Sequence, residues 1–67
     1  MLLKEYLDAL IASKPTWNVT VLVHGIEVIR CNISDLNFDI IASNLLYSNV
    51  GLVSYDYPSQ RYFYHVN

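Results

Sequence analysis

Apolar residues near the start of the chain recur at spacings of three and four, the period of a helix with one buried face. This stripe consists of Leu2, Leu3, Tyr6, Leu7, Leu10 and Ile11, whereas Lys4, Glu5 and Asp8 fall on the opposite face. Pro15 follows, and a proline disfavours the helical conformation at the residue before it. The pattern therefore predicts an amphipathic helix over about residues 2–13.

Two runs of alternating residues come next, separated by His24 and Gly25. Apolar side chains occupy every second position before the pair, and β-branched residues are frequent in both runs, as is typical of strands. A two-residue hairpin turn needs positive φ at both positions, which glycine adopts freely and histidine tolerates. We predict a hairpin that places Val21 opposite Val28 on the buried face and Thr20 opposite Ile29 on the other.

Residues 32–49 fit two patterns. Ser34 or Asp35 suits a helix N-cap, and Leu36, Ile40 and Ile41 keep helical spacing. The same stretch also alternates as a strand would, with Leu36, Phe38 and Ile40 between Asn37 and Asp39. We favour a short helix over about residues 35–46, because no turn residues separate a further strand from its neighbours.

The chain closes with a second hairpin pattern, in which residues 51–56 and 61–66 flank Tyr57, Pro58, Ser59 and Gln60. Proline at the second position of this tetrapeptide favours a type I turn. The resulting register places Asp56 opposite Arg61, a favourable cross-strand pair. One face of this hairpin then carries Val53, Tyr55, Tyr62, Tyr64 and Val66. The other face carries Leu52, Ser54, Phe63 and His65.

These elements predict an α+β fold for residues 1–67 as a single domain: an N-terminal helix packed on an antiparallel sheet of about four strands, in the order α-β-β-α-β-β. The helix would cover one face of the sheet. Leu22, Ile29 and Leu52 would lie on the uncovered face, together with Phe63. Exposed apolar surface of this kind marks interaction sites, so we expect these first three residues to form a homodimer patch.

Composition strengthens the expectation of a shared surface. Of the 67 residues, 54% are hydrophobic and 15% are charged, which excludes disorder. A chain this short buries only about 60% of its unfolded surface, so it has more apolar side chain than it can easily hide. The net charge is −2 and the four basic residues are scattered, which makes nucleic acid an unfavourable partner.

Residues for catalysis or metal binding are few. His24, His65 and Cys31 fall at no metal-ligand spacing, and two glycines cannot form a phosphate-binding loop. A reactive cysteine needs an electropositive pocket, which a domain of this size rarely encloses. We therefore expect no enzyme activity, no cofactor and no metal. A single cysteine and the lack of a signal or membrane-spanning pattern favour the cytoplasm.

Aromatic residues cluster near the C-terminal end, where six of the nine fall in the last 21 residues. Three interpretations stay open: buried strand residues, a protein-binding surface, or stacking of nucleic-acid bases on the Arg61-Tyr62-Phe63-Tyr64 strand, which lacks the glycine of an RNA-recognition motif. As candidate partner-binding residues we select Tyr55, Tyr57, Tyr62, Phe63 and Tyr64.

The order of short motifs resembles a group of small α+β proteins encoded by phages and mobile elements. The shared features are the Leu3-Lys4-Glu5-Tyr6-Leu7 helix, the valine-rich hairpin, the Ile33-Ser34-Asp35-Leu36 turn and the final hairpin. That group includes inhibitors of host defence such as anti-CRISPR proteins, which act by occluding a host protein. The resemblance implies a non-catalytic, cytoplasmic inhibitor, and it carries over no functional residue.

Overall fold

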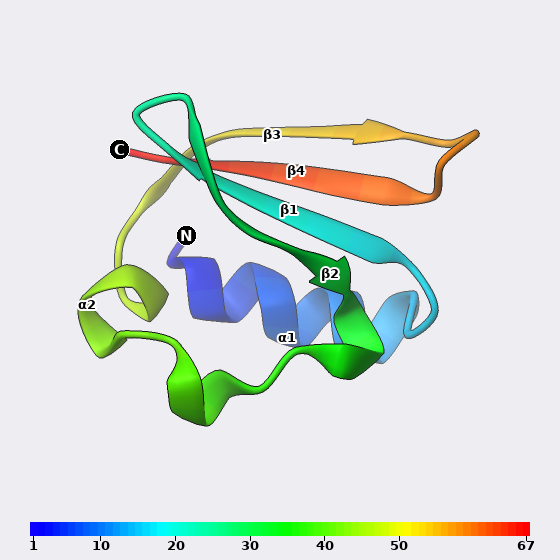
Figure 1. The fold of residues 1–67 in the computed structure, drawn as a ribbon, viewed down its shortest axis with the longest axis horizontal. Coiled ribbons are helices and arrows are strands. Elements are labelled where there is room, and N and C mark those ends of the chain that lie inside the picture. Colours follow the sequence, from blue (N-terminus) through cyan, green and yellow to red (C-terminus); the bar gives the residue numbers. More distant parts are fainter.

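A four-stranded sheet and one long helix form the two layers of the computed structural model, which describes residues 1–67 (Figure 1). The regular elements are α1 (Leu3–Ser13), β1 (Asn18–Val23), β2 (Ile26–Asn32), β3 (Val50–Asp56) and β4 (Arg61–Val66). The connection between β2 and β3 contains the short turns η1 (Ile33–Asp35), η2 (Phe38–Ile40) and α2 (Ser43–Leu46). The predicted α+β fold, with an N-terminal helix packed on a four-stranded sheet, is confirmed.

The strand order is β2-β1-β4-β3, so the first strand of one hairpin lies beside the last strand of the other. Each hairpin is antiparallel, as predicted, but β1 and β4 pair in parallel, so the sheet is mixed rather than antiparallel throughout. The reason lies in residues 33–49, which cross the length of the sheet before β3 begins. Only a crossover connection of this kind can bring two strands into parallel register.

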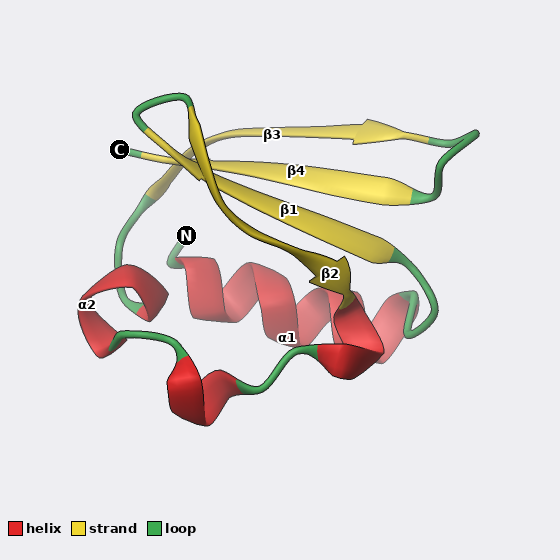
Figure 2. Ribbon diagram, viewed as in Figure 1, coloured by secondary structure: helices red, strands yellow, loops and turns green.

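Both α1 and this crossover lie on the same side of the sheet, and the opposite face is left open (Figures 1 and 2). The helix buries Leu3, Leu7 and Leu10 against the sheet. These residues form the centre of the predicted apolar stripe, whereas Ile11 of that stripe is 40% exposed. The rest of the core is formed by Trp17, Val19, Val21, Ile33, Leu46, Tyr64 and Val66. The covered face of the sheet is therefore built mainly from the central strands β1 and β4.

The predicted turn at His24 and Gly25 is confirmed, with φ of 51° and 77°. The pairs next to it also agree, but a bulge then shifts the register between Val21 and Leu22. Val21 lies opposite Ile29, not Val28, and Thr20 lies opposite Arg30, not Ile29. From Ile29 onward, the extra residue reverses which side chains of β2 face the helix side.

As a result, Ile29 and Cys31 pack against the core, whereas Val28 is 49% exposed and Ile26 is 68% exposed. The predicted placement of Ile29 on the open face is wrong, and Val28 is not buried in the core, although it lines a cavity beneath the crossover. β2 carries apolar residues at both alternating positions, so its periodicity is compatible with either face. Packing against residues 33–46 selects the face that contains Ile29.

The predicted continuous helix over residues 35–46 does not form: only its last turn, α2, is α-helical, and no strand replaces the rest. Asn32 accepts a hydrogen bond from the Ser34 backbone amide at 3.0 Å, and Asn37 accepts one from the Asp39 amide at 3.0 Å. Each asparagine therefore starts a separate 3-10 turn. Such side-chain bonds to the local backbone compete with a continuous helix, so the segment breaks into short turns that follow the sheet.

The second hairpin has the predicted register, with Asp56 opposite Arg61 and Tyr55 opposite Tyr62. The two charged side chains do not form an ion pair, because each has another partner. The Asp56 carboxylate accepts hydrogen bonds from the Ser59 amide at 3.2 Å and the Ser59 hydroxyl at 2.6 Å. Asp56 thus stabilises the turn rather than the strand pair.

Candidate functional site

Four aromatic side chains meet at the end of the sheet that lies beyond the C-terminus of α1. We call Trp17, Tyr55, Tyr57 and Tyr62 the aromatic cluster. Tyr55 and Tyr62 are cross-strand partners on β3 and β4. Trp17 directly precedes β1, and the parallel pairing of β1 with β4 brings the Trp17 ring to Tyr62. Tyr57 opens the β3–β4 turn, so four positions distant in sequence converge on one surface.

The four rings contact one another in a closed circuit. Tyr57 meets Trp17 edge to face at 5.3 Å between ring centroids, and it meets Tyr55 in the same way at 5.3 Å. Tyr62 completes the circuit, with centroid distances of 5.2 Å to Trp17 and 5.6 Å to Tyr55. These separations lie in the favourable range for aromatic pairs, each of which contributes about 0.5–1.5 kcal/mol beyond its buried area.

The aromatic cluster is connected to the hydrophobic core through Tyr64, and a lysine side chain lies against two of its rings. Tyr62 stacks on Tyr64 at 5.9 Å, and Tyr64 in turn packs against Tyr6 of the helix at 5.4 Å. Lys14, the residue that caps the end of α1, holds its ammonium nitrogen 5.6 Å from the Trp17 ring centroid and 5.9 Å from that of Tyr62. Both distances fit cation–π contacts.

Exposure differs sharply within the cluster. Trp17 is 7% exposed, whereas Tyr55 is 58% exposed and Tyr57 is 63% exposed. Two tyrosines therefore present most of their surface to solvent while a buried tryptophan fixes one of them from behind. The site is consequently ordered before any partner arrives, which reduces the conformational entropy lost on binding.

The structure separates the five residues that the sequence selects for partner binding. Tyr55, Tyr57 and Tyr62 come together, as described. Tyr64 is only 2% exposed, so its ring belongs to the core and we remove it from the surface. Its burial, together with the neighbouring Tyr62 and Tyr6 rings, raises the pKa of the Tyr64 phenol well above its usual range. Phe63 alternates with these tyrosines and points to the open face.

Trp17 and Lys14 are members of this site that sequence reasoning missed. Both stand near Pro15, at least 40 residues before Tyr57 in the chain. The only signal that could have found them is the pairing of Asn18 with Arg61, and that parallel pairing follows from the crossover. Local periodicity contains no information about it.

The open face of the sheet is mixed in character. Leu22 and Leu52 flank His65 in one row across the strands, but Ile29 lies on the other side of the sheet, so the predicted dimer patch of Leu22, Ile29 and Leu52 does not form. Arg61 donates hydrogen bonds to the Thr20 hydroxyl at 2.8 Å and the Val19 carbonyl at 3.0 Å.

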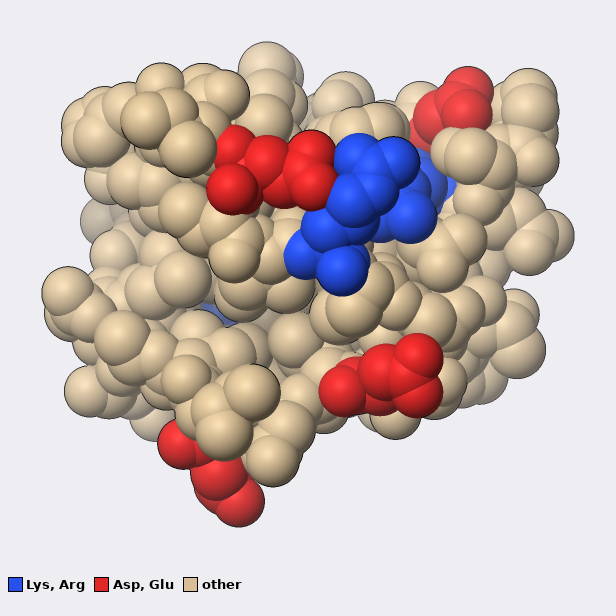
Figure 3. All heavy atoms as spheres, in the orientation of Figure 1, with Lys and Arg blue, Asp and Glu red and all other residues tan.

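Charged side chains cover little of the molecular surface. In the view of Figure 3, basic atoms gather mainly in one patch beside an acidic side chain, and most of the remaining surface is uncharged. Arg30 is paired with Glu27 at 3.1 Å, and Lys4 is paired with Asp8 at 2.8 Å. Strong electrostatic attraction of a nucleic-acid backbone would need more unpaired basic groups in one place.

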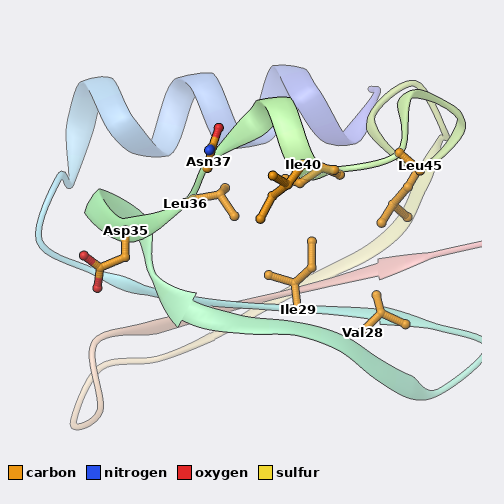
Figure 4. A pocket seen from close by; sticks show the side chains of 9 residues that line it. Val28, Ile29, Asp35, Leu36, Asn37, Ile40 and Leu45 are labelled. Carbon is orange, nitrogen blue, oxygen red and sulfur yellow. The ribbon is translucent and has the colours of Figure 1, made fainter.

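A cavity of about 340 Å³ lies between β2 and the crossover (Figure 4). Val28 and Ile29 of β2 face Leu36 and Ile40 across it, whereas the labelled Asp35 side chain points away. Small-molecule sites normally combine an apolar lining with convergent polar groups. This cavity has an apolar lining, but polar groups do not converge in it. Ile29 lines this cavity and does not belong to an open surface.

The groups considered for chemistry lie apart from one another. His24 occupies the hairpin turn, whereas Cys31 lies near the far end of β2. Partial burial, with the nearby Asp35 charge, raises the pKa of the Cys31 thiol, which opposes formation of the reactive thiolate. No three His, Cys, Asp or Glu side chains are grouped so that they could hold a metal ion. No helix is both long enough and apolar enough to cross a membrane.

Comparison of the chain with protein-family models, with curated proteins and with solved structures found no match.

Proposed function

We propose that this chain is a non-catalytic protein-interaction module whose binding surface is the aromatic cluster. The observation that carries the proposal is the combination of exposure and order at Tyr55 and Tyr57. These residues are 58% and 63% exposed, yet edge-to-face contacts hold Tyr57 against both Tyr55 and Trp17. A surface that served only the fold would not require this much ordered aromatic area in solvent.

Tyrosine and tryptophan dominate the energetics of protein interfaces, because they bury a large area while few rotatable bonds become fixed. Removal of one central residue of this kind commonly costs at least about 2 kcal/mol of binding free energy, or about 30-fold in affinity. Charge is scarce at interface centres. The aromatic cluster meets both conditions, with Lys14 as the cation at its margin.

The resemblance to small phage-encoded proteins suggests the class of partner. On that basis we propose a host-defence protein of CRISPR type, in the cytoplasm of a bacterial cell, whose functional surface the module would occlude. Such inhibition needs a stable complex and no chemistry, which agrees with an ordered cluster and a protonated Cys31.

Single-stranded nucleic acid is the second candidate, because bases can stack on exposed aromatic rings beside a cation such as Lys14. It is less favoured, because Arg61 donates its hydrogen bonds on the other side of the sheet and Arg30 is paired with Glu27. The two candidates differ in salt dependence, since phosphate binding weakens steeply as salt rises.

The test uses three tyrosine variants of matched exposure. Y55A and Y57A remove members of the cluster, whereas Y47A removes a tyrosine that is 57% exposed at the end of α2. Tagged chains capture proteins from a bacterial lysate, and the affinity of each captured protein is then measured with purified material. We expect Y55A and Y57A to weaken binding about 30-fold and Y47A to leave it unchanged.

A parallel titration with a fluorescein-labelled oligo-dT of 15 nucleotides, at low and high salt, tests the second candidate. Salt-sensitive binding of this probe that Y55A abolishes would replace the protein partner with nucleic acid. Equal binding by all three variants would show that the aromatic cluster serves only the fold.

A further inference from the structure

The two edges of the sheet are built differently. β2 is one edge, and it carries a bulge together with the charged side chains of Glu27 and Arg30. Bulges and charges are the usual features that prevent an edge strand from pairing with another chain. β3 is the other edge. Its start is paired, because Met1 accepts a hydrogen bond from the Val50 amide and Leu2 bridges Asn49, but no further strand lies beside the rest of it (Figure 2). Its register with β4 is continuous from Leu52 to Asp56.

The protective features of β3 are confined to its two ends: an irregularity between Val50 and Leu52, and the single charged residue Asp56. No lysine, arginine or proline interrupts Leu52–Asp56, and the carboxylate of Asp56 is occupied by Ser59 in the turn. Leu52 is 58% exposed, and so is Tyr55. An edge strand offers a row of unpaired backbone N–H and C=O groups, which another extended strand can satisfy.

We propose that β3 pairs antiparallel with β3 of a second copy of this chain, so that the two sheets join into one eight-stranded sheet across a two-fold axis. A second copy is the occupant that the strand itself specifies. An isologous contact requires a self-complementary surface. The segment Leu52–Asp56 has no bulge, and its only charge lies at one end, so an antiparallel copy can face it without placing the two charges opposite each other.

The register of this pairing follows from the length of the regular segment. In an antiparallel two-fold pair, opposed residues must share a face of the sheet, so the axis lies between two copies of the same residue. An axis at Ser54 opposes all five residues of Leu52–Asp56. An axis at Val53 runs into the irregularity at Gly51, and an axis at Tyr55 leaves only three residues paired. Ser54 therefore gives the longest ladder.

This register also sets favourable side-chain pairs. Val53 lies opposite Tyr55 of the second copy on the helix side, and pairs of an aromatic with a β-branched residue stabilise antiparallel sheets. Asp56 lies opposite Leu52 of the second copy, so the two acidic groups are kept apart. The pairing brings both aromatic clusters to the same side of the joined sheet, next to the two-fold axis.

The inference goes beyond the proposed function and can fail separately from it. Tyr55 takes part in both, because it belongs to the aromatic cluster and to the proposed ladder, whereas Tyr57 lies outside β3 and Ser54 lies outside the cluster. Y57A should weaken capture of the partner without changing the molar mass of the free protein. Charge substitutions at Ser54 should lower the molar mass without weakening capture of the partner.

Charge substitution at Ser54 provides the test, because this exposed residue would face itself across the axis. S54K and S54E each place like charges opposite each other, and their equimolar mixture places opposite charges there. The matched control is S43K, which adds the same charge at an exposed serine of α2, away from β3. Light scattering over a hundredfold dilution measures molar mass, and circular dichroism confirms that each variant is folded.

We expect the wild-type chain and S43K to be dimers, and S54K and S54E to dissociate at concentrations about tenfold or more higher. The equimolar mixture should recover the dimer. A wild-type chain that is monomeric throughout the range overturns the proposal, and the edge would then remain open for a strand of another protein. A dimer that persists in both Ser54 variants overturns it as well, as does a mixture that stays monomeric.

Discussion

The two glycines of the chain allow space and backbone conformation to be compared directly as causes of stability. A Cβ atom added at Gly25 would meet no heavy atom within 4 Å. A Cβ atom at Gly51 would lie 2.6 Å from the side-chain oxygen of Asn67 and 2.7 Å from its nitrogen. On space alone, alanine should be harmless at Gly25 and damaging at Gly51.

Backbone conformation predicts the opposite result. Gly25 has φ of +77°, in the left-handed region, where a side chain costs about 1–2 kcal/mol. Gly51 lies outside that region, and the side chain that it would contact belongs to the exposed residue Asn67, which can rotate away. Alanine at a compatible glycine adds about 0.4–1 kcal/mol by restricting the unfolded chain. We therefore expect G25A to be less stable than G51A by about 1–3 kcal/mol.

Urea unfolding followed by the fluorescence of Trp17, the single tryptophan, measures both variants. A loss of 1 kcal/mol in a domain of this size lowers Tm by about 4–8 °C, so thermal scans should resolve the difference. The reasoning is refuted if G25A is as stable as the wild-type chain, or if G51A is the more damaged variant. H24N serves as a control, because asparagine tolerates the φ of 51° at this position and should not destabilise the turn.

Two further predictions concern the core. L7A removes a side chain with no exposed surface and should lower the free energy of unfolding by about 2–5 kcal/mol. This is a large part of the total of about 3–10 kcal/mol expected for a chain of this length. I11A, on the same helix but at a residue that is 40% exposed, should lower it clearly less when both variants are unfolded in urea. Burial, with the neighbouring Tyr62 and Tyr6, raises the pKa of Tyr64, so above about pH 10 the unfolded chain releases a proton that the folded chain keeps. The free energy of unfolding should therefore fall by up to about 1.4 kcal/mol for each pH unit above that point, and Y64F should remove this loss when urea midpoints are compared between pH 8 and pH 11. An equally steep alkaline decline in Y64F would contradict the assignment.

The elements that depend on neighbouring residues could be predicted from the sequence. Helical spacing from Leu3 to Leu10 determined both the presence of α1 and the face that it buries. The His24-Gly25 pair determined a turn with positive φ at both positions, and the residues around Pro58 determined the second hairpin and its register. In each case the backbone preference and the hydrophobic period depend on residues that are close in the sequence. They can therefore be recognised from a single sequence.

The tertiary structure alone decided the relations between distant segments. The crossover sets the parallel pairing of β1 with β4, and that pairing brings Trp17 and Lys14 to Tyr62. The bulge in β2 turns Ile29 toward the core, although both faces of the strand are apolar. Burial of Tyr64 and exposure of Tyr57 likewise follow from where α1 ends over the sheet. These outcomes depend on contacts between residues far apart in the chain, whose free energies are comparable for several arrangements until the whole core is assembled.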